Sequence, residues 1–176
     1  MFRILIFVFI LLKVSIGFSQ GYDVYAIGLF DVKFDGSSSE NATDIRYERR
    51  FDNTIIDIGP EQDNFFYLKP FAGIELTSDS AFYLISGIYL EDNIGELVIG
   101  KNNNWNFTPS FGVGYYDDGD GKKLGNKLEF RTTLELSYQL INKDRIGISL
   151  GHISNANIGN KNPGAEIISI SYQIPF

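Results

Sequence analysis

Three polar residues near the C-terminus have the types and spacing of an esterase site. His152 is the only histidine of the chain, Ser154 follows it by two positions, and Glu166 comes after a further loop. A serine nucleophile needs a base to take its proton, and the base needs a third group that fixes its tautomer and stabilises the imidazolium. These residue types therefore fit ester hydrolysis through a Ser-His-Glu triad.

The positions of these residues in two predicted strands allow the geometry that a triad needs. Side chains alternate between the faces of a strand, so His152 and Ser154 share a face and lie about 6.5 Å apart along it. If the loop of residues 155–165 makes the strands antiparallel, with His152 opposite Glu166, their Cβ atoms lie about 4.5–5.5 Å apart. The imidazole would then lie between the hydroxyl and the carboxylate.

The three polar residues also extend the apolar faces of their strands. Ile148 and Leu150 precede His152 on its face, and Ile168 follows Glu166. A simpler interpretation applies if these strands cross a membrane. The apolar band that faces the lipid then ends near Leu150 and Ile168, and the three polar groups lie just beyond it, in the layer of lipid headgroups. Ionisable groups at membrane depth are costly and usually functional, but the cost fades near the interface. Position alone therefore leaves both interpretations open.

Composition limits the classes of protein to which the chain can belong. With 176 residues it forms one domain, and with no cysteine and one histidine it has neither disulfides nor the ligands of a structural zinc site. The formal net charge of −7 argues against a nucleic-acid partner. The 10 tyrosines and 15 phenylalanines fit a β-protein with aromatic girdles.

Residues 1–19 are predicted to be a signal peptide. Arg3 gives a positive start, an apolar run follows, and small residues precede Gln20. The run is shorter than the roughly 20 residues of a spanning helix, although a retained anchor is the alternative. Cleavage near Gln20 would leave residues 20–176 as a single domain.

Alternation of apolar and polar residues predicts eight strands. The clearest has Glu129, Arg131 and Glu135 on its polar face and large apolar residues on the other. Residues 91–104 are less regular, and a short extra strand over 96–99 or a turn of helix is left open. The eight strands are expected over residues 22–34, 43–56, 65–76, 81–90, 107–116, 128–140, 146–154 and 166–176.

Three features favour a closed membrane barrel over an antiparallel sandwich with a dry core, which predicts the same alternation. The strand number is even, as in small outer-membrane barrels with an apolar outside and a polar inside. The polar faces carry both charge signs, as expected for ion pairs in a narrow lumen. The terminal Phe176 resembles the assembly signal of bacterial outer-membrane proteins. We therefore predict an all-β fold, an eight-stranded antiparallel transmembrane β-barrel.

The last 25 residues resemble the PagL family of lipid A 3-O-deacylases. The resemblance rests on His-Ile-Ser-Asn-Ala at 152–156, Asn-Pro-Gly at 162–164, Glu166 and the final Tyr-Gln-Ile-Pro-Phe. The family has a His-x-Ser-Asn-Ala motif and a glutamate twelve residues after the serine, and both spacings are kept here. Before these residues the resemblance is only architectural.

This resemblance implies an esterase that removes the acyl chain at the 3-position of lipid A from the lipid-facing outside of an eight-stranded barrel. By carry-over, Ser154 is the nucleophile, His152 the base and Glu166 the group that orients the base. No cofactor or metal is implied. The implied partners are lipid A, as part of lipopolysaccharide, and the bacterial outer membrane. The oligomeric state stays open, with a homodimer among the alternatives.

Attack on an ester carbonyl builds negative charge on oxygen, which needs preorganised hydrogen-bond donors. Asn155 and Asn162 occupy positions of the family motif and are candidate oxyanion donors, through the side chain or the backbone N–H. Asn157 departs from the family pattern, in which glycine is frequent. Asparagine tolerates left-handed backbone geometry better than most residues.

Two other functions remain open from the sequence. The chain can be a non-catalytic structural or adhesive eight-stranded outer-membrane barrel that keeps the motif without activity. It can also be an esterase for another position or another lipid, because acyl-chain selectivity depends on the shape of a groove.

Overall fold

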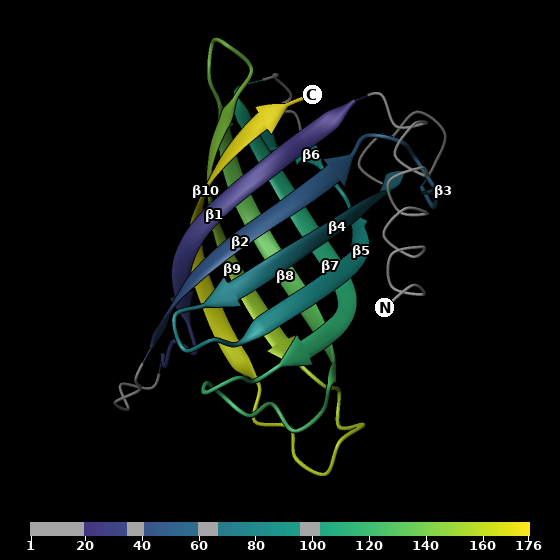
Figure 1. The fold of residues 1–176 in the computed structure, drawn as a ribbon. Helices are drawn as coiled ribbons and strands as arrows, with labels where there is room; N and C mark the ends of the chain where they lie inside the picture. The colour runs from purple at the N-terminus through teal and green to yellow at the C-terminus, as the bar shows by residue number, and fades with distance from the viewer. Residues whose placement is uncertain (1–19, 35–40, 60–66, 96–102) are drawn as a thin grey trace, which may run out of the picture.

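The described chain forms one closed antiparallel β-barrel (Figure 1). The computed structural model describes residues 20–34, 41–59, 67–95 and 103–176. The predicted signal peptide and the optional strand over 96–99 lie outside the described residues. The barrel strands are β1 (Gly21–Phe30), β2 (Ala42–Phe51), β4 (Tyr67–Thr77), β5 (Phe82–Tyr89), β7 (Trp105–Asp117), β8 (Leu128–Gln139), β9 (Arg145–Ser154) and β10 (Ala165–Pro175).

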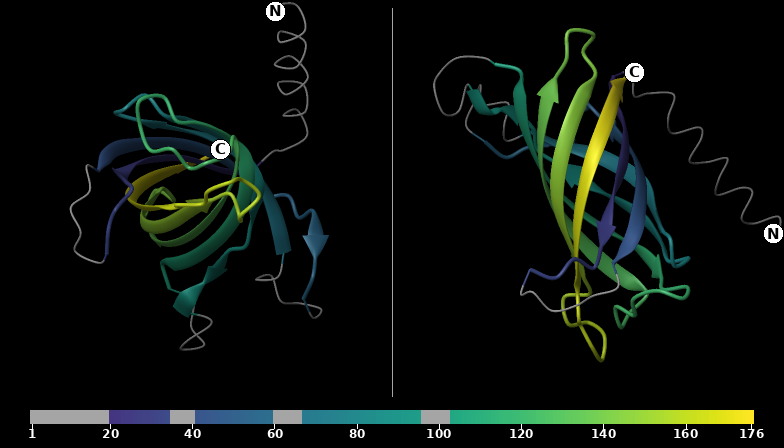
Figure 2. Two further views of the ribbon diagram at one scale, coloured as in Figure 1. Left: turned by 90° about the horizontal axis from the view of Figure 1, so that it is seen from below. Right: turned by 90° about the vertical axis from the view of Figure 1, so that its left-hand side faces the viewer.

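Pairing of the first and last strands closes the barrel. β1 and β10 pair antiparallel from Tyr22 opposite Pro175 to Phe30 opposite Ile167. Seen from below, the strands make one wall around a lumen (Figure 2). Two short strands lie outside this ring: β3 (Ile56–Asp57) pairs with β4, and β6 (Asp92–Asn93) pairs with β7. The predicted fold class of eight antiparallel strands is confirmed.

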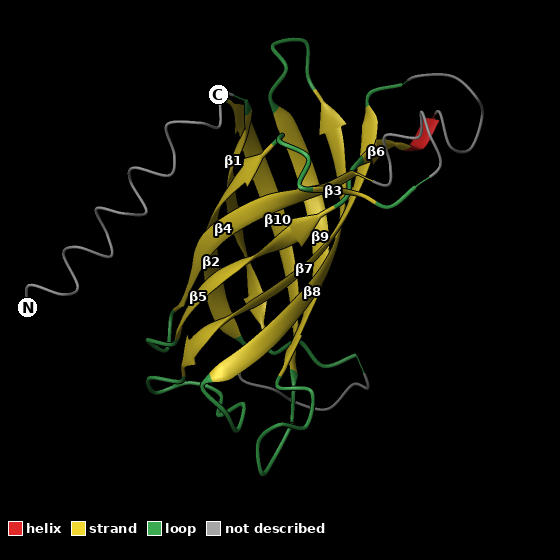
Figure 3. Cartoon of the chain, turned by 90° about the vertical axis from the view of Figure 1, so that its right-hand side faces the viewer, coloured by secondary structure: helices red, strands yellow, loops and turns green. Residues whose placement is uncertain are grey.

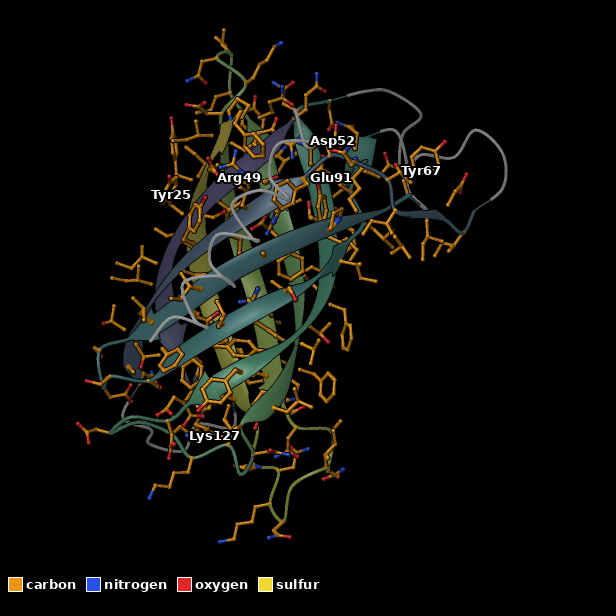
Figure 4. The ribbon with its side chains drawn as sticks, turned by 45° about the vertical axis from the view of Figure 1, so that its right-hand side comes forward. Tyr25, Arg49, Asp52, Tyr67, Glu91 and Lys127 are labelled. Atoms are coloured by element: carbon orange, nitrogen blue, oxygen red, sulfur yellow. The ribbon has the colours of Figure 1, made fainter. Side chains whose placement is uncertain are left out.

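The two faces of the wall have opposite polarity. On β9, Ile146, Ile148 and Leu150 face outward and are exposed, whereas the residues between them are buried. Tyr25 likewise lies on the outer wall (Figure 4). An apolar outside around a polar inside is the arrangement of a barrel in lipid. None of the described helical residues belongs to a helix long and apolar enough to cross a membrane.

Buried ion pairs fill the middle of the lumen. Arg131 pairs with Glu75 at 2.6 Å and also with Glu48. Arg50 pairs with Glu135 at 2.6 Å and with Glu48 at 3.1 Å. These charges come from three strands, so they tie opposite walls of the barrel together. The prediction of ion pairs in a narrow lumen is confirmed.

An apolar cluster closes the lumen at the end where β9 finishes and β10 begins. The Phe30 and Tyr116 rings stack with centroids 6.3 Å apart and planes 8° apart. Ile153 and Ile167, each 0% exposed, pack into the same cluster with Leu124. The wall near this end therefore has packed side chains behind it, and a site there must open outward.

A salt bridge lies at the opposite end of the lumen. Both Glu91 carboxylate oxygens accept hydrogen bonds from the Arg145 guanidinium, at 2.7 and 3.2 Å. Burial alone would raise the pKa of Glu91, but the adjacent Arg145 cation outweighs it and holds the pKa below its usual range. This carboxylate therefore stays ionised where it is packed between β5 and β6.

Two predicted strands extend too far. The strand predicted over 22–34 ends at Phe30, because Asp31 takes a left-handed φ of 63° and the Val32 N–H turns to the Glu166 carbonyl. The strand predicted over 43–56 ends at Phe51. The Asp52 N–H still donates to the Gln20 carbonyl next to β1, but the chain then leaves the wall, and the Ile55 N–H donates to the Leu68 carbonyl instead.

Removal of one lumen cation should destabilise the barrel strongly. Arg131→Met leaves Glu75 without its ion-pair partner, and breaking a buried pair costs about 3–5 kcal/mol. The free energy of unfolding, measured by urea titration in vesicles, should fall by that amount.

Arg49→Met is the matched control, because Arg49 is 40% exposed and lies 3.9 Å from Asp23. Its loss should cost about 1 kcal/mol or less. Equal losses of stability in the two variants would contradict a structural role for the lumen pairs.

Candidate active site

His152 and Glu166 face each other across β9 and β10. The two residues are direct partners in the antiparallel register, the arrangement that was supposed from the sequence. Their side chains lie on the outer wall and are joined by a hydrogen bond of 2.8 Å between Nδ1 and Oε1. The contact is partly open, since the side chains are 50% and 36% exposed.

This hydrogen bond selects the tautomer of the imidazole. An ionised carboxylate only accepts hydrogen bonds, so the Nδ1–H of His152 donates to Glu166. The lone pair is then on Nε2, the ring nitrogen that can take a proton from a nucleophile. In this tautomer Nε2 of His152 is free to accept a proton.

Ser154 is the last residue of β9 and lies on the same face as His152. It is half-buried, and it pairs in register with Phe130 of β8. Within the described part of the chain, its hydroxyl forms no hydrogen bond with His152. Catalytic hydrogen bonds are often long in ligand-free structures and tighten on binding. The structure therefore brings the three predicted residues to one patch of the outer wall.

Apolar side chains border this patch toward the middle of the barrel. Leu150 and Ile168 are outward neighbours of His152 and Glu166 along their own strands, and they pair with each other. On the β8 side, Thr132 pairs with His152, and Phe130 stacks on Phe111 at 6.0 Å. The polar pair thus lies at the edge of an apolar surface that can hold hydrocarbon.

A tight turn follows Ser154. Ala156 and Asn157 both have positive φ, 53° and 64°, and the Ile158 N–H donates to the Asn155 carbonyl at 3.0 Å. Two left-handed central residues with this hydrogen bond form a type I′ turn. Asparagine tolerates the left-handed region, which explains how Asn157 occupies a position where glycine is frequent in the resembled family.

The Asn155 side chain is fully buried and joins two loops. Its Nδ2 donates to the carbonyls of Leu124 and Lys161, each at 2.8 Å. Its backbone N–H donates to Oδ1 of Asn162 at 2.9 Å. The bond to Leu124 therefore holds the loop after Ser154 against the loop between β7 and β8, and the bonds to Lys161 and Asn162 hold that first loop together internally.

Glycine is needed where these two loops touch. A Cβ atom on Gly125, whose φ is +94°, would lie 2.2 Å from the Lys161 carbonyl oxygen and 3.4 Å from Nδ2 of Asn155. Gly164 fits against the imidazole in a similar way, since a Cβ there would lie 3.0 Å from Cε1 of His152. These contacts fix the loop positions on both sides of the candidate site.

Asn162 has a free donor within the described contacts. Its Oδ1 accepts the Asn155 N–H, which orients the side-chain amide, and Nδ2 forms no other hydrogen bond among the described residues. In the same part of the chain, no group of three or more His, Asp or Glu side chains is arranged to hold a metal ion.

The sequence did not reveal every residue around the site. The Asn142–Asp144 turn sets the register of β8 against β9, so the pairing of Thr132 with His152 could have been read from it. The role of Gly125 had no such signal, because loop-to-loop contacts follow no strand periodicity.

Comparison with known proteins supports the family suggested by the motif. The sequence model of the family described as lipid A 3-O-deacylase (PagL) matches residues 94–175. A curated relative, lipid A deacylase PagL of Bordetella bronchiseptica, is 34% identical over 55 residues, which is 31% of each chain. The match thus spans about a third of the length of that relative.

Solved structures share the architecture. The crystal structure of the outer membrane enzyme PagL superposes with a TM-score of 0.66 at 17% identity, covering 88% of this chain and 99% of that one. A de novo designed transmembrane β-barrel reaches 0.55 at 11% identity, covering 88% and 95%. Neisserial surface protein A reaches 0.53 at 9% identity, covering 89% and 96%.

At these identities the solved structures show the common fold. The family match adds more, because its residues include the whole His152, Ser154 and Glu166 constellation. On these matches and the shared barrel, the C-terminal half of the chain is similar to the PagL family, and the whole chain shares the fold of the PagL enzyme.

Proposed function

We propose that the chain is an outer-membrane lipid A 3-O-deacylase that works from the lipid-facing side of its wall. The observation that carries this proposal is the hydrogen bond between His152 and Glu166 on the outer wall, with Ser154 on the same face. The family match and the name of the Bordetella bronchiseptica relative support the substrate class. No cofactor or metal takes part in the proposed reaction.

In the proposed reaction, the Ser154 hydroxyl attacks the carbonyl carbon of the 3-linked ester. Nε2 of His152 takes the serine proton, and Glu166 stabilises the imidazolium. The tetrahedral intermediate collapses, the sugar oxygen leaves with the proton from His152, and an acyl-serine ester remains. Water, deprotonated by His152, then hydrolyses this ester, which releases the fatty acid and restores the serine.

The oxyanion donor we propose is Nδ2 of Asn162, with Asn155 as the residue that positions it. The N–H groups of Asn155 are engaged in holding the loops and in orienting Asn162. Asn162 then presents its Nδ2 to the oxyanion. A donor held in place before the reaction costs no reorganisation in the transition state.

An outward-facing site suits a substrate whose acyl chains are in the membrane. The apolar border formed by Leu150 and Ile168 can contact hydrocarbon, and the polar pair lies nearer the barrel end. A lumenal site would require extraction of the chains past the buried ion pairs of Arg131 and Arg50. We infer that the end carrying Ser154 faces the cell exterior, where lipid A lies.

Ser154→Ala should abolish hydrolysis while the barrel still folds. The rate should fall by roughly 10⁴-fold or more, because the nucleophile is lost. The measurement is mass spectrometry of lipid A incubated with each refolded protein in detergent, with gel mobility before and after heating as the test of folding.

Thr43→Ala is the control for this experiment, because Thr43 is an exposed outward residue of β2 near the same barrel end. It should keep wild-type activity. Intact lipid A after incubation with folded wild type would overturn the deacylase proposal and favour a non-catalytic barrel or another lipid substrate.

The Asn162→Asp variant tests the hydrogen-bond donor Nδ2 of Asn162 separately from the contact that Asn162 makes with the Asn155 N–H. Aspartate keeps an oxygen for the Asn155 N–H but replaces the Nδ2 donor by a carboxylate oxygen. If Nδ2 stabilises the oxyanion, kcat should fall by about 10²–10³-fold. Measurement of kcat and KM checks this, and a kcat close to wild type would remove Asn162 from the oxyanion site.

Gly125→Ala should impair catalysis although Gly125 is 29 positions before Ser154 in sequence. The added Cβ would push against the Lys161 carbonyl and displace the loop that Asn155 holds. A displacement of about 1 Å in a catalytic group can cost about 100-fold, so we expect a loss of that order in kcat with little change in KM.

Gly119→Ala is the matched control in the same loop. Gly119 also has positive φ, +51°, and its added Cβ would lie 2.3 Å from the Ser80 carbonyl oxygen, away from the candidate site. It should leave kcat near wild type. Equal kcat losses in both variants would mean that the loop acts only through general stability.

A further inference from the structure

Residues 52–59, the described part of the segment between β2 and β4, lie to the side of the barrel wall (Figure 1). They contain β3, which pairs with β4 at Ile56 opposite Leu68 and Asp57 opposite Tyr67. Figures 1 and 3 show β3 beside the wall, and Figure 4 shows Tyr67 out to the same side. We call residues 52–59 the lateral arm.

The lateral arm carries an exposed apolar surface. Ile55, Ile56 and Ile58 are 55%, 52% and 58% exposed. The backbone of the arm is locally ordered, because the Ile55 N–H donates to the Leu68 carbonyl at 2.8 Å and the Gly59 N–H donates to Asp57 at 3.1 Å. Three neighbouring isoleucines held in this way would be unfavourable in water.

The position of the arm along the barrel indicates how deep in the membrane it lies. The arm lies at the end that holds the termini of the barrel, where the Phe176 N–H donates to the Gly21 carbonyl. At the same end, Trp105 and Tyr138 are exposed on the outer wall, with ring centroids 5.1 Å apart. Exposed aromatic residues of this kind lie at the boundary between lipid and water.

Backbone hydrogen bonding limits how deep the arm can lie. Among the described strands, β3 pairs only with β4, so its other edge presents unpaired backbone groups. Such groups cost several kcal/mol each in the hydrocarbon core, but they meet water and headgroups at the interface. The Asp57 carboxylate between the isoleucines sets the same limit on depth, because a charged group is costly in the middle of the bilayer and much less so near the interface.

We propose that the lateral arm is a membrane-contact element that inserts its isoleucines into the headgroup–acyl boundary of the leaflet around the terminus-bearing end. Its partner is phospholipid. This proposal rests on the membrane location within the proposed function and is independent of catalysis.

A single labelled cysteine tests the depth of the arm, since the chain has no natural cysteine. Ile56→Cys is labelled with the environment-sensitive fluorophore NBD, and the refolded barrel is placed in phosphatidylcholine vesicles. Some vesicles contain lipid with a nitroxide near the headgroup, and others contain lipid with a nitroxide near the chain end. Ile58→Cys gives a second position if the first variant folds poorly.

Two further single-cysteine variants calibrate the signal. Lys143→Cys lies in the exposed turn before β9 and should report water. Ile148→Cys lies on the outer face in the middle of β9 and should report the hydrocarbon. If Ile148→Cys is not quenched, the membrane location itself fails, which is distinct from failure of the arm.

The expected result for Ile56→Cys is blue-shifted emission relative to Lys143→Cys, with at least twofold stronger quenching by the shallow nitroxide than by the deep one. Emission and quenching equal to those of Lys143→Cys would overturn the proposal. Blue-shifted emission without quenching by either lipid would also overturn it, because the arm would then be covered by protein, such as a second copy of the chain.

Discussion

Pairing of β1 with β10 is the constraint on which the rest of the structure depends. In lipid, every backbone N–H and C=O must find a partner within the protein, and closure provides these partners for all eight strands of the ring. A ring of this size has a lumen only wide enough for side chains. The inward positions therefore carry charges that neutralise one another, such as Arg131 with Glu75, and an apolar cluster around Phe30 fills the end behind the candidate site.

A filled lumen leaves the outer wall as the surface on which the site is built, and two kinds of support position it there. The ladder of hydrogen bonds between β9 and β10 sets His152 opposite Glu166. Ser154 lies where that ladder ends, so its position depends on the following loop. The buried Asn155 side chain provides this second support by tying the loop to the carbonyls of Leu124 and Lys161. The catalytic assignment remains our proposal, whereas these supports are features of the fold.

The parts of the structure that obey a period of two could be predicted from the sequence. Strand alternation placed His152 and Ser154 on one face of their strand, and the inward charges of β8 followed from the same pattern, whereas the register of His152 with Glu166 was a supposition that the pairing of β9 with β10 bears out. The lateral arm did not, because Ile55 falls on the apolar parity of β2 and extends the pattern, although the chain leaves the wall at Phe51. Periodicity describes which face a side chain takes, and it does not reveal when a strand loses its neighbour.

The exposure of His152 and Glu166 on the outer wall also determines how a ligand reaches them. A molecule that comes from the surrounding lipid arrives by lateral diffusion in two dimensions. Its effective concentration is then its mole fraction in the leaflet, and the volume of the surrounding solution has no influence on the encounter rate. Addition of an inert lipid would lower the encounter rate even when the total amount of ligand is constant. For a ligand of this wall of the barrel, the bilayer is the solvent.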